Sequence, residues 1–376
     1  MYFLNGDRDY IKPKGTCALL DEQVQDIFRQ LKKINSGKRI FKLNFFADTT
    51  SADDYNKLQR GLKQLVAEHF EHSVICALIA QPPLTCRILA EAFYFDFSLW
   101  EADSVLTENG SAMLFKRDDV KVLVGNAQAD YASDCHGSSD AAFLAFGELL
   151  QKSGIPLDAV VRQWNYIENI TGFDGSSQRY QEFNNVRTDF YAGHFNENGY
   201  PAATGIGMNR GGVIIEFVAV SAPNVLSLPL DNPEQVSAHE YSGEVLVGME
   251  NSCKSTPKFE RARYLELFGK KQVFISGTAS IRGELTVGID DPVEQTKVTI
   301  QNMQRLYSRD VLSAVPGNSL RPVYGHARVY VKNRKDFAAI KKTFKSYYGN
   351  LPVVYIVADI CRENLLMEIE GKVILK

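Results

Sequence analysis

The sequence lacks any long run of apolar residues. No uninterrupted apolar stretch reaches about 18 residues, the length at which a helix could cross a membrane. No charged segment followed by an apolar one comes after Met1, so the sequence predicts neither secretion nor membrane insertion and favours a cytoplasmic protein. The net charge of −3 gives no basic excess of the kind that binds nucleic acid.

Cysteines are few and none is paired in sequence. The six cysteines include no CxxC pair, which argues against a zinc site or a disulfide framework and favours a reducing compartment. His136 lies beside Cys135 and near Asp134. Adjacent residues on a strand point apart, and the Ser-, Asp- and Gly-rich surroundings predict a loop, so a nucleophilic triad is disfavoured there.

What the sequence does contain is a repeat. Its 376 residues, 45% of them hydrophobic, predict two or three globular domains. Residues 160–220 and 326–371 share one order of elements: a strand, a helix, a strand opened by a proline, and a final strand with a glutamate. These glutamates are Glu216 and Glu368. A repeated unit of this size predicts sites built between units.

A second shared element precedes each copy. Residues 120–129 and 271–280 both read as a buried strand interrupted by glycine and small polar residues. Each is followed by a segment with apolar residues at helical spacing, residues 139–152 and 292–307. The alternation predicts an α+β fold in which each unit is a mixed sheet covered on one face by two helices.

The first hundred residues look like a degenerate third copy. Residues 39–47 resemble the interrupted strand without its glycine, a helix follows from Ala52, and Glu91 lies in a later strand. We expect the second helix of this copy to be absent. The expected domains are residues 1–110, 111–222 and 261–376, joined by a proline-containing connector over residues 223–260.

The second full copy resembles the YjgF/Rid family, small proteins that form trimers with sites in the clefts between subunits. The resemblance lies in Ser276-Gly277, Gln295 and Asn302 on the helix, and Glu368-Ile369-Glu370. It implies tandem YjgF-like units that imitate a trimer within one chain, and we expect this chain to be a monomer. Rid deaminases carry an arginine where this chain has Tyr355. That departure puts imine or enamine deamination in doubt.

A narrower resemblance covers more of the chain. The similarity to the signature blocks of the chorismatases lies in residues 162–167, 179–183, Arg187, 200–207, 276–280, 358–362 and 368–371. This resemblance implies an enzyme of secondary metabolism that hydrolyses the enolpyruvyl ether of chorismate without metal or cofactor. The products would be pyruvate and a hydroxybenzoate or dihydroxycyclohexadienoate. The block around Arg187 departs from the pattern, since Val186 stands where the family has glycine.

The chemistry points to a carboxylic acid. An enol ether is cleaved by protonating its terminal methylene carbon, and the acid must hold its proton near neutral pH. Strand alternation places Glu368 and Glu370 on one face, where burial and mutual repulsion would raise the pKa of one of them. The family resemblance selects Glu368 as the acid. We expect its counterparts Glu216 and Glu91 to be structural.

The substrate carries two carboxylates, for which arginine is the best-suited side chain. Arg162, Arg179 and Arg187 are the candidates, with Arg328 or Arg362 as alternatives. The resemblance adds further pocket residues: Tyr180, Tyr200, Thr204, Gly277 and Cys361. Each has a plainer interpretation. Arg179 and Arg187 could form a solvated helix face, Arg162 could lie in ordinary packing, and Glu368 could be half of a buried ion pair.

Several alternatives remain open. A Rid-type deaminase and a non-catalytic binder of small carboxylates are the competing functions, the latter favoured by Val186. The resemblance to the chorismatases implies that small pocket residues decide the product, so Gly277 and Cys361 favour 3-hydroxybenzoate. The branch depends on the placement of one hydroxyl against the cation.

Overall fold

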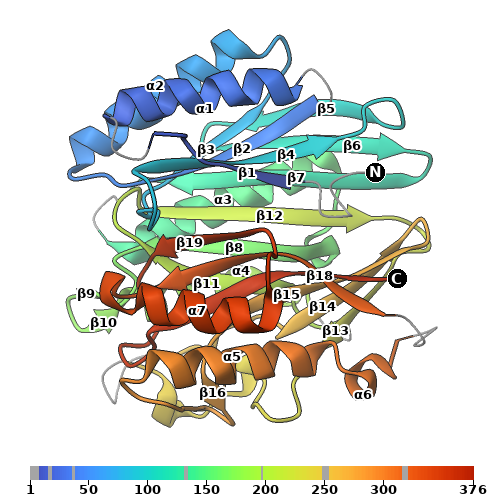
Figure 1. Cartoon of the computed structure of the whole chain (residues 1–376). Helices are drawn as coiled ribbons and strands as arrows, with labels where there is room; N and C mark the ends of the chain where they lie inside the picture. Colours follow the sequence, from blue (N-terminus) through green and yellow to red (C-terminus); the bar gives the residue numbers. More distant parts are fainter. Residues whose placement is uncertain are drawn as a thin grey trace.

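The computed structural model describes residues 8–376 except for residues 16–18, 36–38, 131–133, 196–197, 248–253 and 316–320. The chain forms three successive units whose sheets face one another, with the helices on the outside (Figure 1). Within the described part of the chain, no helix is long and apolar enough to cross a membrane.

The first unit has two helices over a small sheet. Its elements are β1 (Arg8–Ile11), α1 (Leu20–Asn35), β2 (Arg39–Ala47), α2 (Ala52–His69), β3 (Ile75–Ile79) and β4 (Ile88–Phe95), with sheet order β1-β4-β2-β3. The expected loss of a helix is therefore wrong. Val24, Ile27, Phe28 and Leu31 give α1 a buried face at helical spacing, so the first helix precedes β2 rather than following it.

The second unit has a sheet of six strands. Its elements are β5 (Glu101–Thr107), β6 (Gly110–Arg117), β7 (Val120–Ala129), α3 (Cys135–Ser153), η1 (Leu157–Ala159), β8 (Val160–Glu168), β9 (Phe173–Asp174), β10 (Ser177–Gln178), α4 (Arg179–Tyr191), β11 (Ala202–Met208) and β12 (Val213–Ser221). The sheet order is β11-β8-β12-β7-β6-β5. The sheet begins at Glu101, within the expected range of the first unit. Asp134, expected in a loop, caps the start of α3.

The third unit repeats this sheet. Its elements are β13 (Leu226–Leu230), η2 (Ala238–Glu240), η3 (Gly243–Val245), β14 (Ala262–Leu267), β15 (Lys270–Thr278), β16 (Ile281–Arg282), β17 (Leu285–Thr286), α5 (Pro292–Leu306), α6 (Arg309–Leu312), β18 (Pro322–Val331), η4 (Arg334–Asp336), α7 (Phe337–Tyr348), β19 (Val353–Val357) and β20 (Met367–Leu375). The sheet order is β13-β14-β15-β20-β18-β19. Strand β13 comes from the expected connector and joins this sheet.

The three units share one core topology. In each unit one central strand pairs in parallel with a second strand and antiparallel with a third. The central strand is β2 in the first unit (with β3 and β4), β8 in the second (with β11 and β12) and β18 in the third (with β19 and β20). Each unit packs its helices on one face of its sheet through a separate apolar cluster. The opposite faces of all three sheets share a single inner cluster. The predicted α+β architecture of tandem units, each a mixed sheet with two helices on one face, is confirmed.

Three buried ion pairs join the units in a ring around this inner cluster. Lys42 of the first unit pairs with Glu216 of the second, and Arg162 of the second pairs with Glu370 of the third. Arg328 of the third unit closes the ring on Glu91 of the first. All six side chains are buried, so each charge must be compensated by its partner because water cannot reach it. The charges therefore specify how the units meet.

Candidate active site

Glu368 lies on β20, between β15 and β18, and faces the seam between the second and third units. Its side chain is 4% exposed. No hydrogen-bond partner among the described residues contacts its Oε1 atom. A buried carboxyl oxygen without a partner is costly, and such groups are concentrated at functional sites.

A glycine in the neighbouring strand makes room for this carboxyl. The pairing of β15 with β20 shifts register between Ile275 and Thr278, and Gly277 lies in this irregularity. A Cβ atom on Gly277 would collide with Oε1 of Glu368 and lie 2.9 Å from its carboxyl carbon. Glu368 can therefore rest against the backbone of β15 only because residue 277 has no side chain.

The pKa of Glu368 is raised from 4.5 to about 8. The largest cause is burial, followed by the neighbouring carboxylate of Glu370, while Arg162 and Arg261 lower the pKa by smaller amounts. The direction agrees with the expectation from strand alternation. At neutral pH the carboxyl holds its proton, and a protonated carboxyl at a pocket can act as a general acid.

The equivalent glutamates in the other units are held as ions. Glu91 lies opposite Asn44 in the first sheet, Glu216 opposite Trp164 in the second and Glu368 opposite Tyr330 in the third. The three glutamates therefore occupy matching positions in the three units. Glu216 accepts hydrogen bonds from Lys42 and Asn44. Although burial alone would raise its pKa, Lys42, the charge of Arg328 and the hydrogen bond from Asn44 together lower it to about 2. Glu91 pairs with Arg8 and Arg328. Within the described chain, Glu368 alone of the three has no ion pair.

The pocket around Glu368 is built from two units. The second unit contributes one wall, from Gln178, Tyr180, Gln181, Asn184, Ala203 and Gly205. The third unit and the segment before it contribute the other, from Tyr241, Val245, Leu246, Val247, Pro257, Phe259, Arg261, Gly277, Ala279, Ile281, Cys361, Arg362, Leu365 and Glu368. A site between units is what the repeat predicts.

Two uncharged polar side chains, Tyr180 and Cys361, lie near the acid. Burial raises the pKa of Cys361 to about 12 and raises the pKa of Tyr180 above its usual range. The ring of Tyr180 lies close against Gly205 of β11, since a Cβ added to Gly205 would lie 2.9 Å from it. Tyr180 and Cys361 can therefore donate hydrogen bonds to a ligand without adding charge beside Glu368.

Two arginines line the pocket. Arg261 donates from Nη2 to the carbonyl of Val236 and to the Tyr241 hydroxyl, at 2.7 and 2.6 Å, while its buried Nε has no partner among the described residues. Arg362 donates from Nη1 to the carbonyl of Glu284 at 2.7 Å and lies over the Tyr241 ring. Among the described residues both guanidinium groups bind neutral acceptors rather than carboxylates, so both can pair with an anionic ligand.

The residues expected in the site divide into two groups. Tyr180, Gly277, Cys361 and Glu368 line the pocket together. The others contribute no lining atoms. Arg162 and Thr204 lie behind Glu368, where both contact Glu370.

The remaining expected residues lie further away. Arg187 is buried and donates to Asn184, whose side chain does line the pocket. Arg179 pairs with Asp174 at 3.0 Å and borders a different cavity. Tyr200 stacks on Tyr191. Among the arginines expected from the sequence, the alternative Arg362 lines the pocket, and Arg261, which the sequence did not indicate, lines it too.

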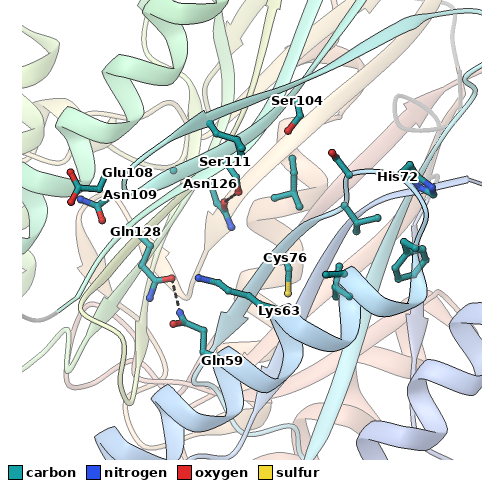
Figure 2. Close-up of a pocket in the computed structure, with 18 of the residues that line it drawn as sticks. Gln59, Lys63, His72, Cys76, Ser104, Glu108, Asn109, Ser111, Asn126 and Gln128 are labelled. Carbon is teal, nitrogen blue, oxygen red and sulfur yellow. Dashed lines mark hydrogen bonds between the residues drawn. The ribbon is translucent and has the colours of Figure 1, made fainter.

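A larger cavity lies at the corresponding seam between the first and second units (Figure 2). Its volume is about 710 Å³, against about 70 Å³ for the pocket at Glu368. Gln59 of α2 donates to Gln128 of β7 at 3.0 Å across it. The glutamate that corresponds to Glu368 at this seam is Glu216, which Lys42 holds as a carboxylate. Among the described residues, the carboxyl that matches Glu368 at this seam is therefore ionised and cannot act as an acid, so chemistry rather than size selects the smaller pocket.

Substituting Gly277 tests the geometry of the pocket. In Gly277→Ala the new Cβ must displace the Glu368 carboxyl, since the Thr204 side chain, 3.1 Å from the Cβ position, blocks the other side. If Glu368 acts as an acid, the rate of the reaction that it catalyses should fall by about 10²-fold or more, the effect of a misplaced catalytic group. Thermal unfolding monitored by circular dichroism should show a folded variant. Full activity would show that Glu368 need not lie where the structure places it. Gly61→Ala is the matched control, because nothing lies within 4 Å of its added Cβ.

The fold and this pocket define an internally triplicated α+β protein that holds a protonated carboxyl at the seam between two of its units. Residues 98–219 match a family model described as the N-terminal part of FkbO/Hyg5-like chorismatases. A 3-hydroxybenzoate synthase of Streptomyces hygroscopicus is 30% identical over 62% of this chain and 68% of that protein. The chain belongs to the chorismatase family.

Two further proteins show the same relationship. A chorismatase of Streptomyces hygroscopicus is 32% identical over 60% of this chain and 64% of that protein. A crystal structure of a chorismatase superposes with a TM-score of 0.72, at 22% identity and over 97% of both chains. The second similarity concerns the fold, and it extends over nearly the whole of the three-unit architecture.

Proposed function

We propose that this protein hydrolyses the enolpyruvyl ether of chorismate and releases pyruvate, with Glu368 as the general acid. The observation that carries the proposal is the Glu368 carboxyl, buried at the pocket without an ion pair, with its pKa raised to about 8 chiefly by burial. Membership of the chorismatase family supports the choice of substrate.

The proposed reaction begins with proton transfer to carbon. The Glu368 carboxyl gives its proton to the terminal methylene carbon of the enol ether, and the electron pair of the carbon–carbon double bond forms the new C–H bond. Water adds to the resulting oxocarbenium ion and gives up a proton to the Glu368 carboxylate, and collapse of the hemiketal breaks the ether bond to give pyruvate and the dihydroxycyclohexadienoate. When the neighbouring ring hydroxyl adds instead, it gives its proton to Glu368 and forms a cyclic ketal. Loss of a ring proton then breaks the bond between the ring carbon and that hydroxyl's oxygen, and the resulting hemiketal of the phenol collapses to pyruvate and 3-hydroxybenzoate.

The two carboxylates of the substrate need cationic partners. Arg261 and Arg362 are the arginines that line the pocket, and Arg261 has a buried Nε free to donate. Because Arg261 also lowers the pKa of Glu368, a carboxylate bound to it would offset its charge and favour the protonated acid. Substrate binding would thus help to hold the proton that the reaction uses.

The arginine assignment predicts an effect on substrate binding. Replacing Arg261 with methionine removes charge-assisted hydrogen bonds, each worth about 1.5–3 kcal/mol, so KM should rise by about 10- to 100-fold. The acid remains in place, so kcat should change less. Steady-state kinetics with chorismate would measure both constants. Arg282→Met is the control, because Arg282 pairs with Glu234 and does not line the pocket. Equal KM values for the two variants would remove Arg261 from the substrate site.

We propose 3-hydroxybenzoate as the aromatic product. The proposal rests on Gly277 and Cys361 in the pocket, and on similarity to a protein named 3-hydroxybenzoate synthase. The small side chains at these two positions leave room for the ring hydroxyl to approach the cation. Chromatography against authentic 3-hydroxybenzoate, 4-hydroxybenzoate and dihydroxycyclohexadienoate would identify the product, and a diol as the main product would overturn this assignment.

The direct test is to incubate the protein with chorismate and to assay pyruvate with lactate dehydrogenase. Stoichiometric pyruvate is the expected result, and its absence would remove the proposed activity. The residues on which the competing functions were weighed lie away from the pocket. Tyr355, where Rid deaminases have arginine, packs against Phe337 and Phe344 in the apolar cluster of the third unit. Val186, which favoured a silent binder, is buried in the cluster of the second unit and does not line the pocket.

A further inference from the structure

The ring of ion pairs has one irregular member. At two of the three seams, the cation of one unit pairs with the glutamate at the position that Glu91 and Glu216 share. At the third seam, Arg162 pairs with Glu370, two residues further along β20. If this seam followed the rule of the other two, Arg162 would pair with Glu368.

The irregularity arises from one additional carboxylate. Arg328 on β18 lies opposite Glu370 in the third sheet. At the matching position, Val218 lies opposite Arg162 in the second sheet, and Phe93 lies opposite Lys42 in the first. The first two units therefore have an apolar residue where the third has Glu370. Of these three strands, only β20 therefore carries two carboxyl groups, Glu368 and Glu370, with which a cation of the neighbouring unit can pair.

Glu370 is held firmly in this position. Its Oε2 accepts from Arg162, from the indole nitrogen of Trp164, and from the Thr204 hydroxyl at 3.1 Å. Its Oε1 lies 3.2 Å from Nη1 of Arg328 and accepts from Tyr330 at 3.4 Å. With donors on both oxygens, Glu370 is a fully satisfied buried carboxylate, and the carboxyl of Glu368 beside it is left without a cation.

We propose that Glu370 is a positioning residue that captures Arg162 and so keeps Glu368 free of the ion pair that engages the equivalent glutamate in each of the other two units. This inference rests on the proposed role of Glu368 as the acid. Loss of the Glu370 carboxylate releases Arg162 to pair with Glu368, which then becomes an ion like Glu216. One substitution outside the pocket lining thereby converts an acid site into a structural one.

Other charged groups around Glu368 do not replace this role. The groups that face it are Glu370 on its own strand, Arg162 on β8, Tyr330 on β18, Tyr180 on α4, Cys361 before β20 and Arg261 before β14. Tyr180, Tyr330 and Cys361 are neutral, since burial raises the pKa of each. Arg261 is bound to the Val236 carbonyl and the Tyr241 hydroxyl. Arg162 is therefore the cation whose partner decides the charge of Glu368.

The test compares Glu370→Gln with the double variant Glu370→Gln/Arg162→Met. Glutamine keeps the shape of residue 370 but not its charge. In the single variant we expect the Glu368 carboxyl to titrate at least one pH unit lower than its pKa of about 8, so kcat at pH 7.5 should fall at least about threefold as the protonated fraction falls. In the double variant no cation remains to pair with Glu368, so its titration and kcat should recover toward wild type. A merely structural role predicts the opposite, because a second buried substitution would add to the damage.

Two readouts keep this test independent of the proposed activity. Titration of the Glu368 carboxyl is followed without substrate, by carbon NMR of protein labelled at the glutamate carboxyls and assigned with Glu368→Gln. Pyruvate release from chorismate gives the pH profile of kcat. An unmoved titration in the single variant, or no recovery in the double, would overturn the inference. Absence of pyruvate from wild type would overturn the proposed function instead, while the titrations still decide the role of Glu370.

Discussion

Replacing Glu368 with glutamine should lower pyruvate release from chorismate by about 10²- to 10⁴-fold, the contribution of a positioned general acid. Glutamine has nearly the shape of a protonated glutamate, so Gly277 still accommodates it, but it cannot give a proton to carbon. The loss should therefore appear in kcat, with KM nearly unchanged. Wild-type activity should in turn fall as the pH rises through about 8, because Glu368 then loses its proton.

The matched control is Glu216→Gln, the same change at the equivalent position of the second unit. Glu216 is buried and ion-paired with Lys42, so this variant should lose stability. Activity per folded molecule should remain, since Glu216 does not line the pocket. Wild-type turnover by Glu368→Gln would exclude the proposed mechanism. A comparable loss of kcat in both variants would show that the effect comes from folding rather than from proton transfer.

The substitution Glu368→Gln should also change how the stability of the protein depends on pH. Because the pKa of Glu368 is raised from 4.5 to about 8 on folding, its contribution to stability is full below pH 4.5 and is lost as the pH rises through 8. Glutamine does not titrate. The stability of Glu368→Gln relative to wild type should thus increase with pH in this window, by at most about 1.4 kcal/mol per pH unit. Urea unfolding at several pH values would measure the difference, and a flat difference would contradict the raised pKa.

The sequence predicted those features that depend on local patterns. Strand alternation in β20 placed Glu368 and Glu370 on one face, and the repeat predicted both the sheet-and-helix units and a site between them. Helix α1 was missed although Val24, Ile27, Phe28 and Leu31 carry the helical spacing that would have identified it. Residues 39–47 were matched to the first strand of the other two units, whereas they form the strand that follows the first helix. The helix before them was therefore not sought.

The partners of the arginines could not be predicted in this way. Strand alternation leaves open whether Arg162 faces a cleft or ordinary packing, and only the approach of the third unit shows that it pairs with Glu370. Arg261 lies just after the expected connector, more than 100 residues before Glu368, and reaches the pocket through tertiary packing. Contacts across the seams depend on the rigid-body arrangement of the units, for which a single sequence carries no local signal.

Replacing Arg328 with methionine should cost about 3–5 kcal/mol of unfolding free energy, the usual effect of removing one partner from a buried ion pair. Arg328 has no exposed side-chain surface, and it joins Glu91 of the first unit to Glu370 of its own. It also donates to the Tyr166 hydroxyl of the second unit at 2.7 Å. One guanidinium thus contacts all three units. Methionine fills much of its volume but leaves buried carboxylates short of a partner, and urea unfolding followed by circular dichroism would measure the loss.

Two comparisons show whether this loss comes from the position of Arg328 rather than from the substitution itself. Arg305→Met makes the same change at a pair whose Asp310 is 75% exposed, so it should cost less than about 1 kcal/mol. Arg328→Lys keeps the charge, yet a single ammonium lacks the planar fork that reaches Glu91, Glu370 and Tyr166 together, so most of the loss should persist. Equal unfolding midpoints for Arg328→Met and Arg305→Met would show that the ring of ion pairs does not hold the units together. The apolar cluster shared by the three sheets would then have to supply that stability alone.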